Sequence, residues 1–162
     1  MHGKMLIAYF SASPSRRTEQ VAHRIADVIG ADLYEIVPTV PYTQEDLNWN
    51  NAQSRSSMEM RDPNSRPEIG SKLLDPALYR VIFVGFPIWW YVAPHIINTF
   101  LESYDLTGKT IIPFATSGGS SMGQTTVHLR PSAEGAVVKE GRRFDMGETP
   151  MAINSWIAAL GL

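Results

Sequence analysis

The chain has 162 residues, 44% of them hydrophobic, and 14 basic against 16 acidic residues leave a formal net charge of -2. Length and apolar content suit one globular domain, which we expect to span residues 1–162. The balanced charge gives no electrostatic case for nucleic acid. The absence of cysteine excludes disulfides, thiolate nucleophiles and zinc–thiolate sites.

The sequence contains no stretch near the roughly 20 apolar residues of a membrane span. The first ten residues lack the apolar core and cleavage site of a signal peptide. We therefore expect a cytoplasmic protein with no membrane span.

Apolar runs alternate with helical patterns along the chain. Solidly apolar runs are typical of strands buried on both faces. They predict strands over residues 4–10, 31–37, 79–86, 109–117 and 136–141. Apolar residues at helical spacing predict helices over residues 19–30, 94–106, 120–133 and 149–162.

Glycine, proline and threonine mark the helix ends. Gly30 is a stop signal, and Pro94 suits the first turn of a helix. Pro131 is expected to end the short third helix. Thr149 as cap and Pro150 at the first position begin the closing helix.

Strands that alternate with helices predict a doubly wound parallel sheet covered on both faces. In such sheets, ligands bind beyond the carboxyl ends of the strands, near the switch in strand order. Three loops each follow a predicted central strand: residues 11–18, 87–93 and 116–123. We expect these loops to meet at one edge of the sheet.

The first loop reads "SASPSRRT" and stands where a strand gives way to a helix. Free backbone N–H groups at a helix N-terminus make an anion site, to which hydroxyls and arginines add donors. The alternative is that serine and threonine only cap the helix, with the arginines in solvent. The loop fits neither the nucleoside-triphosphate nor the dinucleotide glycine pattern.

The second loop reads "PIWWYVA". Two adjacent tryptophans cannot share one face of a strand, and the flanking prolines argue against a helix. A planar ligand stacked on the exposed rings would explain them. The alternative is that one tryptophan packs into the core and the other is a chance surface aromatic.

The third loop reads "TSGGSSMG", whose small residues let the backbone approach a ligand closely. Residues 119–123 also spell Gly-x-Ser-x-Gly, the nucleophile elbow of serine hydrolases. That fold needs an acid and then a histidine after the serine, but His128 is the only later histidine and no carboxylate precedes it there. We therefore reject the hydrolase. The four histidines lack the spacing of a metal site.

With these loops in view, the sequence resembles the flavodoxin-like family, in particular the small bacterial flavodoxin-type proteins. The resemblance covers nearly the whole chain and rests on "IAYFSAS", "YTQEDLNWNNAQSRSSMEMRD", "VGFPIWWYVAPHIINTFLE" and "GKTIIPFATSGGSSMG". It implies a flavodoxin-like α/β fold, a doubly wound five-stranded parallel sheet in the order 2-1-3-4-5 with helices on both faces. It also implies non-covalent binding of FMN.

Carried over by position, the resemblance implies a phosphate loop of Ser11, Ser13, Ser15, Arg16, Arg17 and Thr18. The flavin ring would be flanked by Pro87, Ile88, Trp89, Trp90 and Tyr91, with Trp89 or Trp90 stacked on it. Its other side would be closed by Thr116, Ser117, Gly118 and Gly119, with Ser120 and Gly123 nearby. The family's phosphate loop usually has a glycine where this chain reads "PSRR", and we expect an arginine to replace the lost N–H donors.

Three functions fit such a pocket. The first is a flavodoxin proper, a shuttle that transfers electrons between redox partners. The second is an enzyme that takes hydride from NAD(P)H and reduces a quinone or similar acceptor through FMN; the near-balanced charge favours it, because shuttles of the family are strongly acidic. The third is a binding domain that has lost the cofactor. We take flavodoxin-type electron transfer as the general expectation.

The segment over residues 38–79 is too long for a bare connection. Thr43 and Asp46 in "TQED" have the spacing of a capping box, which predicts that part of the segment is the second crossover helix. Two alternatives stay open for Trp49 and the polar run around it. They fold over the ligand site, or they form a helix with a solvated polar face followed by an arginine-rich return loop.

Overall fold

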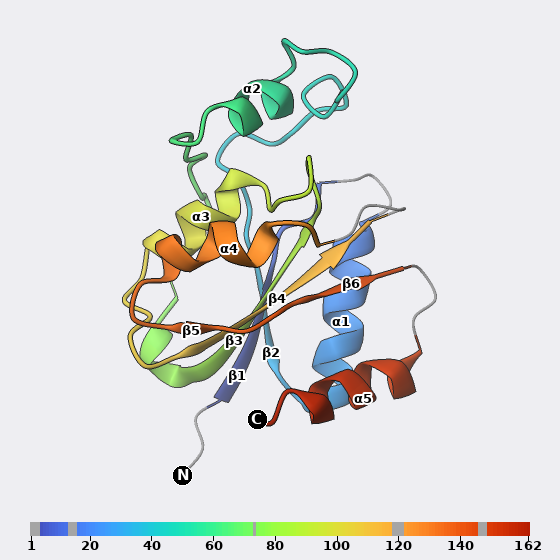
Figure 1. The fold of residues 1–162 in the computed structure, drawn as a ribbon, viewed down its shortest axis with the longest axis vertical. Coiled ribbons are helices and arrows are strands. Elements are labelled where there is room, and N and C mark those ends of the chain that lie inside the picture. The colour runs from blue at the N-terminus through green and yellow to red at the C-terminus, as the bar shows by residue number, and fades with distance from the viewer. Residues whose placement is uncertain (1–3, 13–15, 73, 118–121, 146–148) are drawn as a thin grey trace.

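The computed structural model describes residues 4–12, 16–72, 74–117, 122–145 and 149–162. Its strands are all parallel and form one sheet in the order β2-β1-β3-β4-β5, with β6 also paired to β4 (Figure 1). The order is the one expected for a flavodoxin-like fold. The strands are β1 Lys4–Tyr9, β2 Asp32–Glu35, β3 Tyr79–Pro87, β4 Thr110–Thr116, β5 Val137–Val138 and β6 Arg142–Phe144.

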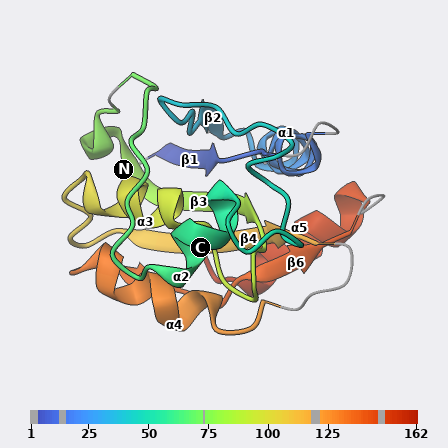
Figure 2. The same ribbon diagram turned by 90° about the horizontal axis from the view of Figure 1, so that it is seen from above.

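Helices cover both faces of this sheet, as Figure 2 shows from above the strand ends. On one face lie α1 Arg17–Ile29 and α5 Pro150–Ala159; on the other lie α3 His95–Glu102 and α4 Thr125–Leu129. The remaining helices are α2 Arg55–Arg61 and two 3-10 turns, η1 Pro76–Leu78 and η2 Arg130–Ala133. No helix within the described ranges is both long enough and apolar enough to cross a membrane.

Two apolar clusters form the core, one on each face of the sheet. Along β1 and the residue after it, Leu6, Ala8 and Phe10 belong to one cluster, while Ile7 and Tyr9 belong to the other. Successive side chains of a strand point to opposite faces, so a solidly apolar run is what a doubly covered strand requires.

The helix ends follow the local signals. Gly30 has a φ of 69°, and its N–H donates to the Ala26 carbonyl at 2.8 Å. The Thr149 hydroxyl accepts from the Ala152 N–H at 3.1 Å, as expected of the cap. Pro94 is the cap residue of α3 and stands just before its first turn. Proline is tolerated there because a backbone N–H at the start of a helix would have no partner within the helix. Pro131 stands inside the 3-10 turn that follows α4.

The fifth strand is split, which differs from the single strand predicted over residues 136–141. The Lys139 N–H donates to the Ile111 carbonyl at 2.9 Å, so the backbone groups of Ile111 face the fifth strand. Every second residue of β4 faces the same neighbouring strand, and the next one is Pro113. Pro113 has no N–H to donate, and Gly141 packs against its carbonyl oxygen. The ladder is interrupted there, and β6 resumes the pairing at the end of β4.

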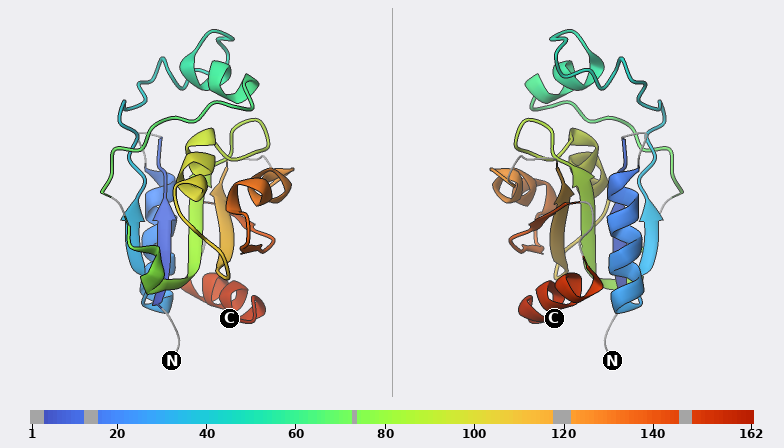
Figure 3. Two further views of the ribbon diagram at one scale, coloured as in Figure 1. Left: turned by 90° about the vertical axis from the view of Figure 1, so that its left-hand side faces the viewer. Right: turned by 90° about the vertical axis from the view of Figure 1, so that its right-hand side faces the viewer.

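Between β2 and β3, residues 38–72 form a long segment that we call the excursion. It rises beyond the carboxyl ends of the strands, with α2 at its far end (Figures 1 and 3). The capping box is present: the Thr43 N–H donates to the Asp46 carboxylate at 2.9 Å, and the Asp46 N–H donates to the Thr43 hydroxyl at 3.1 Å. It closes only a turn, however. The helix begins later, at Arg55, where the Ser54 side chain caps it.

Candidate functional site

The three loops singled out in the sequence meet at the carboxyl ends of the strands. The Thr18 and Thr116 hydroxyls, from the first and third loops, are hydrogen-bonded at 2.8 Å. The Ile88 N–H of the second loop donates to the Thr116 carbonyl at 3.2 Å. Because Thr18 and Thr116 lie 98 positions apart in the chain, the shared edge is a product of the strand order.

The loop after β1 contains a buried polar atom that lacks a hydrogen-bond partner among the described residues, the Ser11 Oγ. Burying an unpaired hydroxyl is costly, so a ligand oxygen at this position would be stabilised. The N-terminus of α1 follows a few residues later, and its free N–H groups favour anions. Ser13 and Ser15, also predicted for this loop, lie outside the described residues.

Arg16 has a left-handed backbone, with a φ of 54°, and it pairs with two carboxylates. Its Nε donates to Glu19 and its Nη2 to Glu35, both at 2.6 Å. Hydrogen bonding from Arg16 holds the pKa of Glu19 below its usual value. The Arg16 charge is therefore offset within the protein, whereas Arg17 is exposed. That either arginine reaches an anion stays a prediction.

Tyr9, at the end of β1, stands beside this ion-pair network. Its hydroxyl donates to Glu19 at 3.3 Å. Burial, together with the neighbouring carboxylates of Glu35 and Glu19, raises the pKa of Tyr9 to about 12, while Arg16 acts against them. The phenol is therefore a hydrogen-bond donor throughout the physiological range.

The aromatic loop after β3 is a tight hairpin. The Trp89 N–H donates to the Val92 carbonyl at 3.0 Å, and the Val92 N–H returns the bond to Trp89 at 3.1 Å. Trp90 and Tyr91 occupy the two central positions with φ values of 49° and 65°. Positive φ at both positions is characteristic of a type I′ turn, which normally contains asparagine or glycine. Bulky side chains are strained in this conformation, so the hairpin holds two aromatic rings at an energetic cost.

The adjacent tryptophans have different environments. Trp89 is half-buried and packs edge-on against Phe10 and Tyr42, with ring centroids 5.9 and 5.5 Å away. Trp90 is 46% exposed and Tyr91 is 60% exposed. One tryptophan thus completes the packing of the loop, and the other presents its ring to the surface.

The loop after β4 lies against this hairpin. Gly123 has a φ of 55°, and a Cβ there would lie 2.6 Å from the Tyr91 carbonyl oxygen, so glycine is required both by conformation and by space. The Gln124 N–H donates to the same carbonyl at 3.2 Å. Ser117 opens this loop, and the predicted Gly118, Gly119 and Ser120 lie outside the described residues.

Arg143 was not found from the sequence, although it lies beside the candidate site. It belongs to β6, and its Nη1 donates to the Ser117 carbonyl at 3.2 Å and pairs with Asp145. No local pattern marked it, because only the pairing of β6 with β4 brings Arg143 next to the third loop.

A cavity of about 500 Å³ separates the excursion from the aromatic hairpin. It is lined by Leu47, Trp49 and Ser56 on one side and by residues 88–91 on the other. Trp49 and Trp90 also line an adjacent hollow of about 320 Å³. The excursion therefore lies over the aromatic loop. That it covers a ligand there, the first of the two alternatives for Trp49, stays a prediction.

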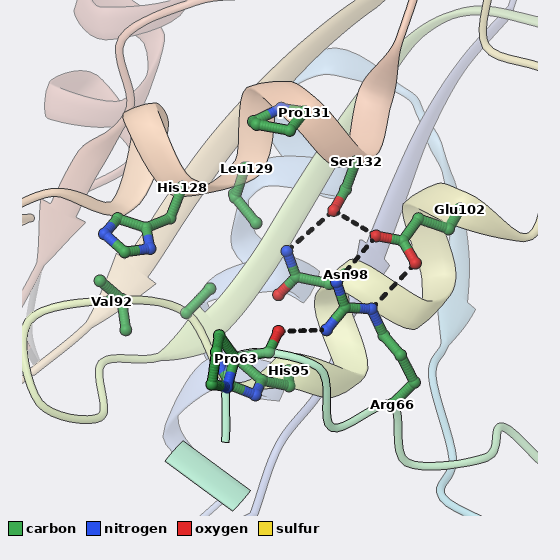
Figure 4. Close-up of a pocket in the computed structure, with 11 residues that line it drawn as sticks. Pro63, Arg66, Val92, His95, Asn98, Glu102, His128, Leu129, Pro131 and Ser132 are labelled. Atoms are coloured by element: carbon green, nitrogen blue, oxygen red, sulfur yellow. Dashed lines mark hydrogen bonds and ion pairs between the residues drawn. The ribbon is translucent and has the colours of Figure 1, made fainter. Parts of the chain in front are cut away.

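A second, polar cavity of about 160 Å³ lies between α3, the start of η2 and the return of the excursion (Figure 4). Arg66 donates through Nε and Nη2 to the two carboxylate oxygens of Glu102, at 2.9 and 3.0 Å. Ser132 donates to Glu102 at 2.6 Å and accepts from Asn98 at 2.9 Å. Hydrogen bonding from Arg66 lowers the pKa of Glu102. This network attaches the excursion to α3.

His95 lines the same cavity and adds a second attachment. The Ser65 hydroxyl donates its one hydrogen to the Glu59 carbonyl at 2.8 Å and lies 2.6 Å from the His95 Nδ1. The imidazole must therefore carry a proton on Nδ1 and donate it to Ser65. Burial, and then the charge of Arg66, lower the pKa of His95 below its usual value.

The sequence matches the family model described as flavodoxin over residues 4–160. The chain belongs to the flavodoxin family. Two crystal structures, each of a "putative flavoprotein", share the flavodoxin-like fold. The one from Bacteroides eggerthii DSM 20697 is 46% identical with a TM-score of 0.91, the match covering 99% of both chains. The one from Bacteroides uniformis ATCC 8492 is 45% identical with a TM-score of 0.90, covering 98% of this chain and 99% of that chain.

A more distant structure also shares the flavodoxin-like fold. It is a flavoprotein in complex with FMN from Lactobacillus acidophilus NCFM, which is 24% identical with a TM-score of 0.71 and covers 87% of this chain and 93% of that chain. At this identity the likeness concerns the fold alone. No curated protein matches the sequence.

Proposed function

We propose that this protein binds FMN non-covalently and acts as a flavodoxin-type redox protein in electron transfer. Membership of the flavodoxin family supports this function, and so does the flavoprotein from Lactobacillus acidophilus, whose structure contains FMN. The observation that carries the proposal is the meeting of three loops at one edge of the sheet, the first of which contains a buried Ser11 hydroxyl without a partner among the described residues. An unpaired donor beside a helix N-terminus fits a phosphate group.

The proposed roles follow the three loops. The phosphate would be held by the loop after β1 and the start of α1, that is by Ser11, Ser13, Ser15, Arg16, Arg17 and Thr18. The ring would lie against residues 87–91, where the exposed Trp90 offers a free face. The loop over residues 116–123 would close the other side. Bound FMN would supply the redox chemistry, while the protein orients the ring and excludes water from it.

A second candidate function is an NAD(P)H-dependent FMN quinone reductase. The specific observation in its favour is the 500 Å³ cavity beside the aromatic hairpin, which is of the size of small-molecule sites. The excursion side of this cavity, lined by Leu47, Trp49 and Ser56, lies beyond the residues proposed for the flavin ring and would admit a small acceptor, which a pure electron shuttle does not need. The near-balanced net charge of -2 points the same way.

The experiment that separates the two functions is anaerobic. The purified protein is loaded with FMN, desalted, and its visible spectrum is followed as NADPH and then NADH is added. Rapid bleaching of the flavin band identifies a reductase, and a retained but unbleached band identifies a shuttle that needs a partner reductase. Loss of all flavin on desalting contradicts FMN binding.

The role of Ser11 can be tested by comparing FMN with riboflavin, which has no phosphate. Ser11→Ala removes one hydrogen bond to a charged group, so we expect the Kd for FMN to rise roughly tenfold or more. The Kd for riboflavin should stay within about twofold, because the ring contacts are untouched. Titration of the fluorescence of each flavin measures both constants. An equal loss for FMN and riboflavin would show that Ser11 supports the loop and does not bind phosphate.

A further inference from the structure

The cavity between the excursion and the aromatic hairpin is held open by fixed contacts. Tyr42 packs against Trp89 at 5.5 Å, and its hydroxyl donates to Glu59 at 2.5 Å. Arg55 lies over the Tyr42 ring, 3.8 Å from its centroid, and donates to Glu59 at 3.0 Å. The Arg66–Glu102 pair attaches the other end of the excursion to α3. The wall formed by the excursion is therefore built into the fold, and a ligand would find most of the cavity ready formed.

Ser56 supplies an independent indication of a ligand. It lines the cavity, it is 2% exposed, and its Oγ is buried without a hydrogen-bond partner among the described residues. Buried hydroxyls are paired in most structures because desolvating an unpaired one is costly. A ligand with an acceptor oxygen at this wall would satisfy the hydroxyl.

The chemistry of the lining restricts the ligand further. Four aromatic rings, from Trp49, Trp89, Trp90 and Tyr91, combine with aliphatic side chains, and none of the described lining residues is charged. Flat rings stack on such walls, whereas phosphate or carboxylate groups need cationic or N–H donors. Trp49 is 70% exposed, an uncommon position for the largest apolar side chain unless something covers it.

We propose that this cavity binds a flat, uncharged aromatic ring that bears a carbonyl oxygen, a compound of the quinone class. Trp49 stacks on the ring, and the Ser56 hydroxyl donates to the carbonyl oxygen. The binding of such a compound does not depend on the proposed flavin-dependent function, but its role does: the bound compound would receive electrons beside the aromatic hairpin. The excursion thereby determines which small molecule reaches the site.

The test uses 1,4-naphthoquinone as the probe and the oxidised, FMN-loaded protein without reductant, so that only binding is observed. The chain has no cysteine that could form a thiol adduct with the probe. As the probe is added, we expect the indole N–H signal of Trp49 in the NMR spectrum to shift progressively until the site is saturated. The signal of Trp156, which packs against Phe83 and Phe144 in the opposite core cluster, should stay in place.

Two variants and one control assign the contacts. Trp49→Ala should raise the Kd of the probe roughly tenfold, and Ser56→Ala roughly three- to tenfold. The control is Met58→Ala, because Met58 is an exposed apolar residue of α2 that lines neither hollow. Its Kd should stay within about twofold of the unaltered protein. All three variants should bind FMN as the unaltered protein does.

Three results would overturn the proposal. Unchanged probe binding in both Trp49→Ala and Ser56→Ala would remove the cavity as its site. A parallel loss of FMN and probe would make the cavity part of the cofactor site. Association of two copies that protects the Trp49 signal without probe would make this face an interface. If the unaltered protein fails to bind FMN, the proposed function fails, yet the shift of Trp49 can still be measured in the flavin-free protein.

Discussion

Trp90, Tyr91 and Gly123 show at the scale of single residues how the candidate site is assembled. The hairpin carries bulky side chains at two positions with positive φ, and strain of this kind persists only where the surroundings hold it in place. Gly123 supplies part of that support, because its lack of a Cβ lets the third loop touch the Tyr91 backbone. The geometry of the aromatic pair therefore depends on a glycine about 30 residues further along the chain.

Gly123→Ala tests this dependence. A Cβ at this position would overlap the Tyr91 carbonyl and would also disfavour the φ of 55°, so we expect the free energy of unfolding to fall by about 1–3 kcal/mol and the affinity for FMN to fall with it. Urea denaturation and flavin titration measure the two effects. Gly30→Ala is the matched control, since Gly30 has a φ of 69° with open space around it; it should lose some stability and keep its FMN affinity.

At the scale of elements, the excursion is joined to α3 by polar contacts more than by apolar packing. Within residues 38–72, all of which the structure describes, only Ser54, Ser56 and Ser57 are buried. The attachment relies on the Arg66–Glu102 pair and on the His95–Ser65 hydrogen bond. Polar attachments of this kind respond to pH, and His95 is the imidazole among the groups that make this one.

The pH dependence can be predicted from the sign of the His95 shift. Its pKa in the folded protein is lowered from the usual 6.5, so between the two values the unfolded chain binds more protons than the folded one. Stability from this group is therefore complete above about pH 6.5 and is lost as the pH falls below it. We expect the free energy of unfolding to decline less between pH 7.5 and 5.5 in His95→Gln than in the unaltered protein, as measured by urea denaturation. Equal declines would contradict the assignment.

At the scale of the whole molecule, the well-packed sheet differs from the excursion, which is attached largely through polar contacts. The sheet is buried under helices on both faces, while the excursion stands beyond the strand ends (Figure 3). Local opening requires the least free energy where few apolar contacts are broken. The candidate acceptor cavity thus has one wall at the end of a central strand, the hairpin after β3, and one wall, the excursion, whose local opening we expect to cost less free energy.

Native-state hydrogen exchange measures this difference directly. We expect the amides of α2 and the surrounding excursion to exchange through local opening, well before those of β1, β3 and β4, which should exchange only on global unfolding. The free energies of exchange, residue by residue, give the comparison. Protection of α2 equal to that of the central strands would show that the excursion unfolds together with the sheet.

Much of the fold and part of the site were predictable from local patterns. Solid apolar runs predicted the central strands because a doubly covered strand must be apolar on both faces, and Gly30 and Thr149 marked helix ends by their backbone and capping chemistry. The order of strands and loops along the chain then placed three loops at one edge. Local chemistry was sufficient for the strands and the helix ends, since each depends on neighbours in the sequence, whereas the meeting of the loops followed from the expected strand order.

The sequence by itself thus determined the strands, the helix ends and the loops that form the candidate site. Only the tertiary structure decided the split of the fifth strand at Pro113, the pairing of Arg16 with Glu35 and the place of Trp49 opposite the aromatic hairpin. The physical reason is distance along the chain. The partners of these residues lie on other elements, so their contacts exist only after the sheet has brought those elements together.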